Sequence, residues 1–271
     1  MITQFLSYRS TSLSRVFAII PNSVSYFSNT LPMAAISEEV LPPFQGSNSV
    51  PPSLFDGTAR LYTTYYCPFA QRAWIARNYK GLHNKIELVA IDLDDRPLWY
   101  KEKVYPLNQV PALEHDNKVI GQSIDVIKYI DSHFEGPSLF PDDPEKLEFT
   151  EELFKFSVKC TEPLFYYLQG KTPESEVRAS LDKFEEYFSK YSEEGPFLLG
   201  AEFTAADAVY APMMLRYHPL FLELHNYDIT EGRPKLAAWL KALETVEAIK
   251  QTKWDPELNL KIFKRRNLGI I

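Results

Sequence analysis

Apolar residues in the stretch 59–133 alternate between spacings typical of strands and spacings typical of helices. "ARLYTTYY" from Ala59 is rich in β-branched and aromatic residues, and "IELVAIDL" from Ile86 is a short apolar run, so both predict strands. Between them, apolar residues recur every three or four positions, which predicts an amphipathic helix that ends near Tyr79. Downstream, the pattern predicts a hairpin over 112–120 and a helix from Ser123.

The order strand, helix, strand, hairpin, helix is the layout of a thioredoxin-like domain, in which a helical crossover joins two parallel strands. From about residue 140 the pattern is helical throughout. Asp143–Pro144 predicts one helix start, and Thr204 with Asp207 predicts a capping box at another. We therefore expect the fold class α/β + all-α, with a thioredoxin-like N-terminal domain over residues 57–138 and an all-helical domain over 139–271.

The first 36 residues have a different composition from the rest. They contain no acidic residue, two arginines and seven serines scattered among apolar residues. This composition is typical of an organelle transit peptide, and the serine excess favours the plastid over the mitochondrion. An ordinary disordered tail is the alternative, and Met33 would serve as a second start that leaves a cytosolic form. Residues 37–56 carry four prolines and little periodicity, so we expect a linker.

Composition and charge narrow the classes of partner. Twenty-nine basic and thirty-six acidic side chains give a net charge of -7, which argues against nucleic acid. The basic cluster at the C-terminus is expected to be a solvated tail and comprises Lys261, Lys264, Arg265 and Arg266. Two cysteines make no disulfide framework and have no metal-ligand spacing with the histidines, so we expect a reducing compartment and no metal. No apolar run approaches the roughly 20 residues of a membrane-spanning helix.

Cys67 is the residue with the clearest chemistry. It stands between the first predicted strand and Pro68, which suits the first position of a helix. A thiol at such an N-cap faces unpaired backbone N–H groups and the positive end of the helix dipole, so we expect its pKa to lie below that of free cysteine. Ala70 takes the place of a second cysteine, so any redox cycle needs an external thiol. An inert, buried Cys67 is the alternative reading.

Cys160 calls for the opposite interpretation. It continues the apolar face of Phe149, Leu153 and Phe156 on a predicted helix. A cysteine on such a face behaves as a small apolar residue, so we expect Cys160 in the core of the helical domain.

Several motifs in order resemble one family. "CPFAQR" at Cys67, "VPAL" at Val110, "GQSIDVIKYID" at Gly121 and "FLLGAEFTAADA" in the helical half are similar to the cysteine-type glutathione transferases. The resemblance covers about residues 55–260 and is strongest to the plant lambda class; the omega class and the dehydroascorbate reductases are more distant. It implies an N-terminal domain that binds glutathione as co-substrate and a monomeric protein.

The resemblance also implies roles for single residues. Val110, before Pro111, would bind the cysteinyl part of glutathione through its backbone, with Pro111 in cis; the alternative is a proline that only starts a strand. Ser123 at a helix N-terminus suits the γ-glutamyl carboxylate. Gln122 replaces the family's acidic residue, so we expect weaker glutathione affinity. Arg96 matches a cation aimed at the glycine carboxylate, although a solvated arginine fits as well.

An apolar substrate would lie between the two domains. Aromatic residues that could line such a cleft are Tyr65, Phe69, Tyr166, Tyr167, Tyr210 and Tyr217. Aromatic residues at helical spacing also form cores, so membership of the hydrophobic core is the alternative for each of them.

These observations favour a glutathione-dependent thiol transferase in which Cys67 removes glutathione from small, aromatic adducts, with dehydroascorbate reduction as a side activity. A carrier that holds glutathionylated or aromatic ligands without turnover is the rival hypothesis. A redox-driven membrane-inserting protein, as in the related intracellular chloride channels, is a third, which we disfavour because Arg72, Arg77, Asn78 and Lys80 interrupt the helix that would insert.

Overall fold

A computed structural model of the chain describes residues 39–269. The predicted transit peptide, residues 1–36, lies outside the described residues, as does Met33. The described part of the expected linker packs on the domain that follows it. Glu39 pairs with Arg77 at 2.6 Å, the Tyr65 hydroxyl donates to the carbonyl of Pro42 at 2.6 Å, and Gln45 forms a parallel β-bridge with Ile91.

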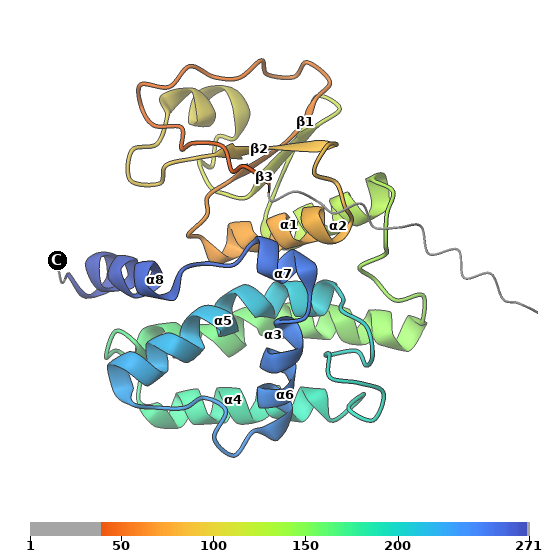
Figure 1. Cartoon of the computed structure of the whole chain (residues 1–271), viewed down its shortest axis with the longest axis vertical. Helices are drawn as coiled ribbons and strands as arrows, with labels where there is room; N and C mark the ends of the chain where they lie inside the picture. Colours follow the sequence, from red (N-terminus) through yellow and green to blue (C-terminus); the bar gives the residue numbers. More distant parts are fainter. Residues whose placement is uncertain (1–38, 270–271) are drawn as a thin grey trace, which may run out of the picture. The chain divides into compact units, whose positions relative to one another are not determined.

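The N-terminal domain is a four-stranded sheet with helices on its faces (Figure 1). Its elements are β1 (Ala59–Thr63), α1 (Pro68–Tyr79), β2 (Ile86–Ala90), a π-helical turn η1 (Tyr100–Val104), β3 (Ala112–His115), β4 (Lys118–Gly121) and α2 (Ser123–His133). The strand order is β2-β1-β3-β4; β1 pairs in parallel with β2, and β3 pairs antiparallel with both β1 and β4. The predicted crossover and hairpin are therefore confirmed.

The C-terminal domain is helical, as predicted, and the fold class is confirmed. Its elements are α3 (Pro144–Tyr167), α4 (Glu174–Phe188), α5 (Ala205–His225), α6 (Pro234–Leu243), α7 (Glu247–Gln251), α8 (Pro256–Phe263) and a π-helical end η2 (Lys264–Leu268). The two predicted helix starts are confirmed. Asp143 accepts hydrogen bonds from the N–H groups of Glu145 and Lys146, and Thr204 and Asp207 form the capping box.

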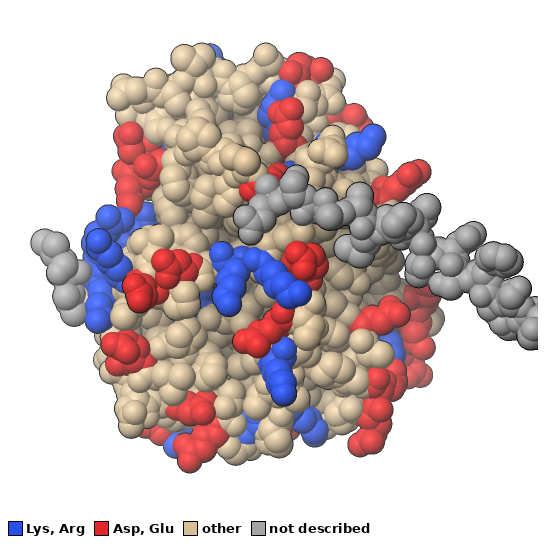
Figure 2. Space-filling model, viewed as in Figure 1, with Lys and Arg blue, Asp and Glu red and all other residues tan. Residues whose placement is uncertain are grey.

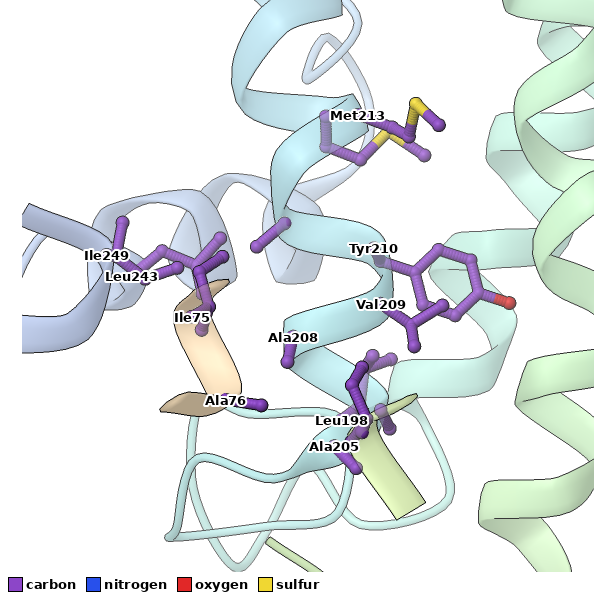
Figure 3. Packing of buried hydrophobic residues seen from close by; sticks show 14 of the residues in the cluster. Ile75, Ala76, Leu198, Ala205, Ala208, Val209, Tyr210, Met213, Leu243 and Ile249 are labelled. Atoms are coloured by element: carbon purple, nitrogen blue, oxygen red, sulfur yellow. The ribbon is translucent and has the colours of Figure 1, made fainter. Parts of the chain in front are cut away.

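Helix α1 lies between the sheet and the helical domain (Figure 1). Residues 70–78 of α1 are all buried, because one face packs on β1 and α2 and the other packs on α5 and α7. Figure 3 shows Ile75 and Ala76 of α1 facing Ala208 on α5, with Leu243 and Ile249 close by. One continuous apolar cluster therefore joins α1 to the helical domain and fixes the helix that begins beside Cys67.

The basic C-terminal segment is not a free tail throughout. Arg265 and Arg266 pair with the carboxylate of Asp94 at 2.7 and 2.5 Å, and the Arg266 guanidinium lies 4.5 Å from the ring centre of Tyr66. Periodicity does not reveal such a contact because its partners are about 170 residues apart in the sequence. The contact ties η2 to the loop after β2.

Candidate active site

Cys67 is the N-cap of α1. Its backbone is extended, with φ -95° and ψ 119°, and its side chain makes no capping hydrogen bond. Pro68 is the first helical residue, and the first turn of α1 carries no acidic side chain. The half-buried sulfur therefore stands beside the positive end of the helix dipole with no carboxylate of that turn to compete.

Gln122 and Ser123 lie at the start of α2. Gln122 is exposed and is the N-cap, with a left-handed φ of 65°, a conformation that is uncommon outside glycine and often marks a functional turn. Its amide nitrogen donates to the side-chain oxygen of Gln109 at 3.5 Å. Ser123 is buried, and its hydroxyl accepts a hydrogen bond from Nη1 of Arg72 at 3.3 Å. The turn thus presents an amide at the surface and a hydroxyl just below it.

Val110 and Pro111 are joined by a cis peptide bond directly before β3. The pairing of β3 with β1 runs to Ala112, so the backbone of Val110 lies beyond the paired part of the sheet. Arg96 is exposed, and its guanidinium donates to the carbonyl of Leu93 at 3.4 Å and to that of Asn108. Arg96 therefore holds the loop that leads into Val110.

The predicted pocket aromatics differ in their exposure and packing. Phe69 and Tyr166 are partly exposed, Tyr217 is buried, and Tyr65 packs between Phe44 and Trp74. Tyr210 is fully buried: it stacks on Phe184, and its hydroxyl donates to the carbonyl of Leu153 at 2.6 Å. Tyr167 stacks on Phe221. Tyr210 and Tyr167 therefore pack among the side chains of the helical domain.

A cavity of about 850 Å³ lies on the helical domain, among α5, α6, α7 and α8. Its apolar wall includes Leu215, Leu240 and Ile249 beside the ring of Trp254. Its charged and titratable lining comprises Arg216, Lys241, Lys250, Lys253, His218 and Glu244. Basic side chains accordingly gather over α7 (Figure 2). The cavity touches α1 through Gln71, and Cys67 is not among its lining residues.

A cluster of buried polar side chains that the sequence analysis missed lies below Cys67. Its members are Gln71, Arg72 and Arg216. The N–H of Gln71 donates to the carbonyl of Cys67 at 3.0 Å, and its side-chain amide donates to the carbonyl of Thr252 at 2.8 Å and accepts from Arg216. Nε of Arg72 donates to the carbonyl of Val209 at 2.8 Å. The sequence signal was the adjacent pair Gln71 and Arg72 between apolar residues in the first half of the helix.

Cys160 lies in the core of the helical domain, as predicted. Its side chain is fully buried, and the hydroxyl of Ser180 donates to its carbonyl at 2.8 Å. Burial raises the pKa of the Cys160 thiol to about 12, so this thiol stays protonated and shielded at neutral pH. Of the two cysteines, only Cys67 has both access and a helix N-terminus.

Two further properties concern the described residues. Across residues 39–269, no helix combines the length and the apolar character that crossing a membrane requires. In the same part of the chain, no three His, Cys, Asp or Glu side chains are grouped as a metal ion would need.

Known proteins match the chain over both domains. Residues 61–138 match the sequence model described as "Glutathione S-transferase, N-terminal domain", and residues 174–242 match that of the corresponding C-terminal domain. "Glutathione S-transferase L2, chloroplastic" of Arabidopsis thaliana is 48% identical over 88% of this chain and 80% of the relative. "Protein IN2-1 homolog A" of Oryza sativa is 51% identical over 81% of this chain and 90% of the relative.

Solved structures share the fold. The crystal structure of glutathione transferase Omega 3C from Trametes versicolor superposes with a TM-score of 0.65, at 25% identity, and covers 78% of this chain and 91% of the other.

Proposed function

Because this chain belongs to the glutathione transferases and is similar to members of their lambda class, we propose that it is a glutathione-dependent thiol transferase with Cys67 as its nucleophile. Its substrates are small, aromatic glutathione adducts, and dehydroascorbate reduction is a side activity. One observation carries the proposal: the accessible thiol stands at the N-terminus of a rigid helix, in a turn that lacks acidic side chains.

The reaction takes two exchanges at sulfur. The Cys67 thiolate attacks the glutathione sulfur of an adduct, the bond between this sulfur and the substrate breaks, and the substrate leaves with the electron pair and takes up a proton. Cys67 is then joined to glutathione in a mixed disulfide. A second glutathione thiolate attacks that disulfide and releases oxidised glutathione and the Cys67 thiolate. Overall the adduct and one free glutathione give the reduced substrate and oxidised glutathione, so the substrate gains the two electrons that the sulfurs of the adduct and of the free glutathione lose on forming their disulfide.

Surrounding residues would hold glutathione during both steps. The unpaired backbone of Val110 beside Pro111 suits the cysteinyl part, which would bind as a short added strand. The start of α2 suits the γ-glutamyl end, because the Ser123 hydroxyl and the helix N-terminus favour a carboxylate and the exposed oxygen of Gln122 can accept from the ammonium group. Arg96, at the edge of the same loop, would meet the glycine carboxylate.

Paired cysteine variants test the proposal. Cys67→Ser should abolish release of the substrate from a glutathionylated aromatic compound, whereas Cys160→Ser should retain most of it, because Cys160 is buried. Mass spectrometry of wild-type protein after incubation with oxidised glutathione should find one added glutathione, on Cys67. Full activity of Cys67→Ser, or an adduct on Cys160 alone, would refute the mechanism.

The carrier hypothesis has its own support in the cavity of the helical domain. The cavity has an aromatic and apolar wall, four cationic side chains and one carboxylate, and Cys67 does not line it. A ligand held there would be bound away from the thiol. If Cys67 forms its glutathione disulfide and added glutathione does not release it over many turnover times, the carrier reading replaces the transferase.

We further propose that the protein acts in plastids as a monomer. The acid-free, serine-rich composition of residues 1–36 supports the location, together with a relative that is named chloroplastic. Imaging of the full chain fused to a fluorescent protein, with a truncation that begins at Met33 as control, tests the location. Light scattering of the purified protein tests the oligomeric state.

A further inference from the structure

Two arginines are buried beneath the first turn of α1. Arg72, five residues after Cys67, is 3% exposed, and Arg216 on α5 is 6% exposed. Arg216 reaches α1 through the side chain of Gln71, whose N–H donates to the carbonyl of Cys67. Both guanidinium groups therefore belong to the interface between α1 and α5, close to the helix start that carries the thiol.

Neither arginine has a carboxylate partner among residues 39–269. Other buried arginines in this part of the chain do: Arg60 pairs with Glu114, Arg77 with Glu39 and Arg233 with Asp182. Nη2 of Arg72 and both Nε and Nη2 of Arg216 also lack a hydrogen-bond acceptor. An unpaired buried charge is costly, so an anion nearby would stabilise both guanidinium groups beyond what their carbonyl acceptors and the rings of Phe69 and Trp254 provide.

Among the described residues, few ionisable groups act electrostatically on the two arginines. They are Cys67, Tyr210 and Tyr217 for Arg72, and Cys67 and Tyr217 for Arg216. Burial raises the pKa of both tyrosines, so they are neutral at physiological pH. Burial lowers the pKa of each arginine only to about 10, so both keep their charge. Cys67 is then the one group of this set that can become an anion.

Among residues 39–269, no carboxylate makes an ion pair with either arginine, although Glu244 lines the same cavity as Arg216. From α2, the neutral hydroxyl of Ser123 meets Arg72, while Asp125 is exposed. After α7, the neutral Thr252 meets Gln71. At η2, Asp94 is already engaged, because both Arg265 and Arg266 pair with its carboxylate. Lys250 on α7 likewise pairs with Glu247 at 3.3 Å.

We propose that Arg72 and Arg216 are the counter-ions of the Cys67 thiolate and act as positioning residues for its charge. This inference rests on the proposed role of Cys67 as the nucleophile. When Cys67 forms a neutral disulfide with glutathione, the arginines lose their anion. That loss favours attack by the second glutathione, because Cys67 then departs as a stabilised thiolate. The pair would therefore assist both exchanges from the same position.

Alkylation of Cys67 by iodoacetamide tests the inference without glutathione or substrate. The rate is followed against pH by mass spectrometry of each cysteine separately. An opposite charge close to an ionisable group shifts its titration by about one to three pH units, so Arg72→Met and Arg216→Met should each move the half-maximal rate upward by about one unit or more. Arg72→Lys keeps the positive charge, so its alkylation profile should stay close to that of wild type.

A matched control and an isosteric variant complete the test. Arg233→Met removes a similarly buried arginine whose partner Asp182 is largely exposed, and it should leave the alkylation profile unchanged. Gln71→Glu retains the side-chain shape and gives Arg216 a carboxylate, so it should also move the profile upward. The Gln71→Glu result remains informative if the methionine variants fail to fold. Alkylation of Cys160, which is buried in the folded protein, would reveal such a failure.

A wild-type profile in Gln71→Glu or in folded methionine variants would overturn the inference, as would an equal shift in Arg233→Met. These outcomes are independent of turnover. A shifted profile in these variants of a protein that shows no thiol transfer would count against the proposed function and not against the counter-ions.

Discussion

Gln122→Glu should tighten glutathione binding. In wild type, the exposed amide of Gln122 stands at the start of α2, where the ammonium group of the γ-glutamyl end is proposed to bind. A carboxylate in the same place would make a charge-assisted hydrogen bond with that ammonium. It would also suit the positive end of the α2 dipole. In wild type, the side-chain oxygen of Gln109 accepts a hydrogen bond from Gln122. In the variant, the side-chain amide of Gln109 can flip and donate a hydrogen bond to the new carboxylate.

The exposure of Gln122 determines how much glutathione affinity the new carboxylate can add. In a buried site an ion pair of this kind would be strong, but Gln122 is exposed, so water and salt screen the new charge. Exposed ion pairs contribute about 0.2–1 kcal/mol. At about 1.4 kcal/mol per tenfold change in affinity, we expect glutathione to bind about 1.4- to fivefold more tightly, with the gain shrinking as salt is added.

Titration calorimetry with reduced glutathione measures the effect, in a Cys67→Ser background so that no disulfide forms. Gln169→Glu, which adds the same charge after α3, is the control and should leave the affinity unchanged. An affinity of Gln122→Glu equal to or below that of the parent would refute the placement of the γ-glutamyl ammonium beside Gln122. An equal gain in the control would show a general effect of net charge.

Two further predictions concern the scaffold. Asp207→Ala removes the acceptor of buried hydrogen bonds from the N–H groups of Leu198 and Thr204 and from Trp239 Nε1. Each orphaned donor costs about 1–3 kcal/mol, so urea unfolding should show a loss of about 3 kcal/mol or more, and a loss below 1 kcal/mol contradicts the capping role. Asp94→Asn should speed tryptic cleavage after Arg265 and Arg266, and unchanged cleavage contradicts the tether. Hydrogen bonding to Arg266 is the main cause that holds the pKa of Asp94 below its ordinary value, so in wild type the tether is complete at neutral pH and is lost only as the pH falls through that lowered pKa.

Local chemistry made much of the fold predictable. Pro68 and Asp143 act within one helical turn, and the hairpin turn places Asp116 and Asn117 at positive φ, so neighbouring residues determine these features. Helix α5 shows where this reasoning ends. Every residue from Ala205 to Met214 is buried, so the periodicity of this stretch does not separate a pocket face from a core face. Tyr210 could be placed only by tertiary packing.

The buried arginines extend this argument to the site itself. From sequence, Arg72 is a polar interruption in α1, and Arg216, 144 residues further along the chain, has no visible connection to it. The fold brings them together because α1 packs on α5 through its apolar face (Figure 3), and Gln71 then bridges the two helices. The helical domain thus provides one of the two buried arginines that we assign to the thiol as counter-ions. A change on α5 that reorients Arg216 should therefore alter the reactivity of Cys67, although no residue of the thioredoxin-like domain has changed.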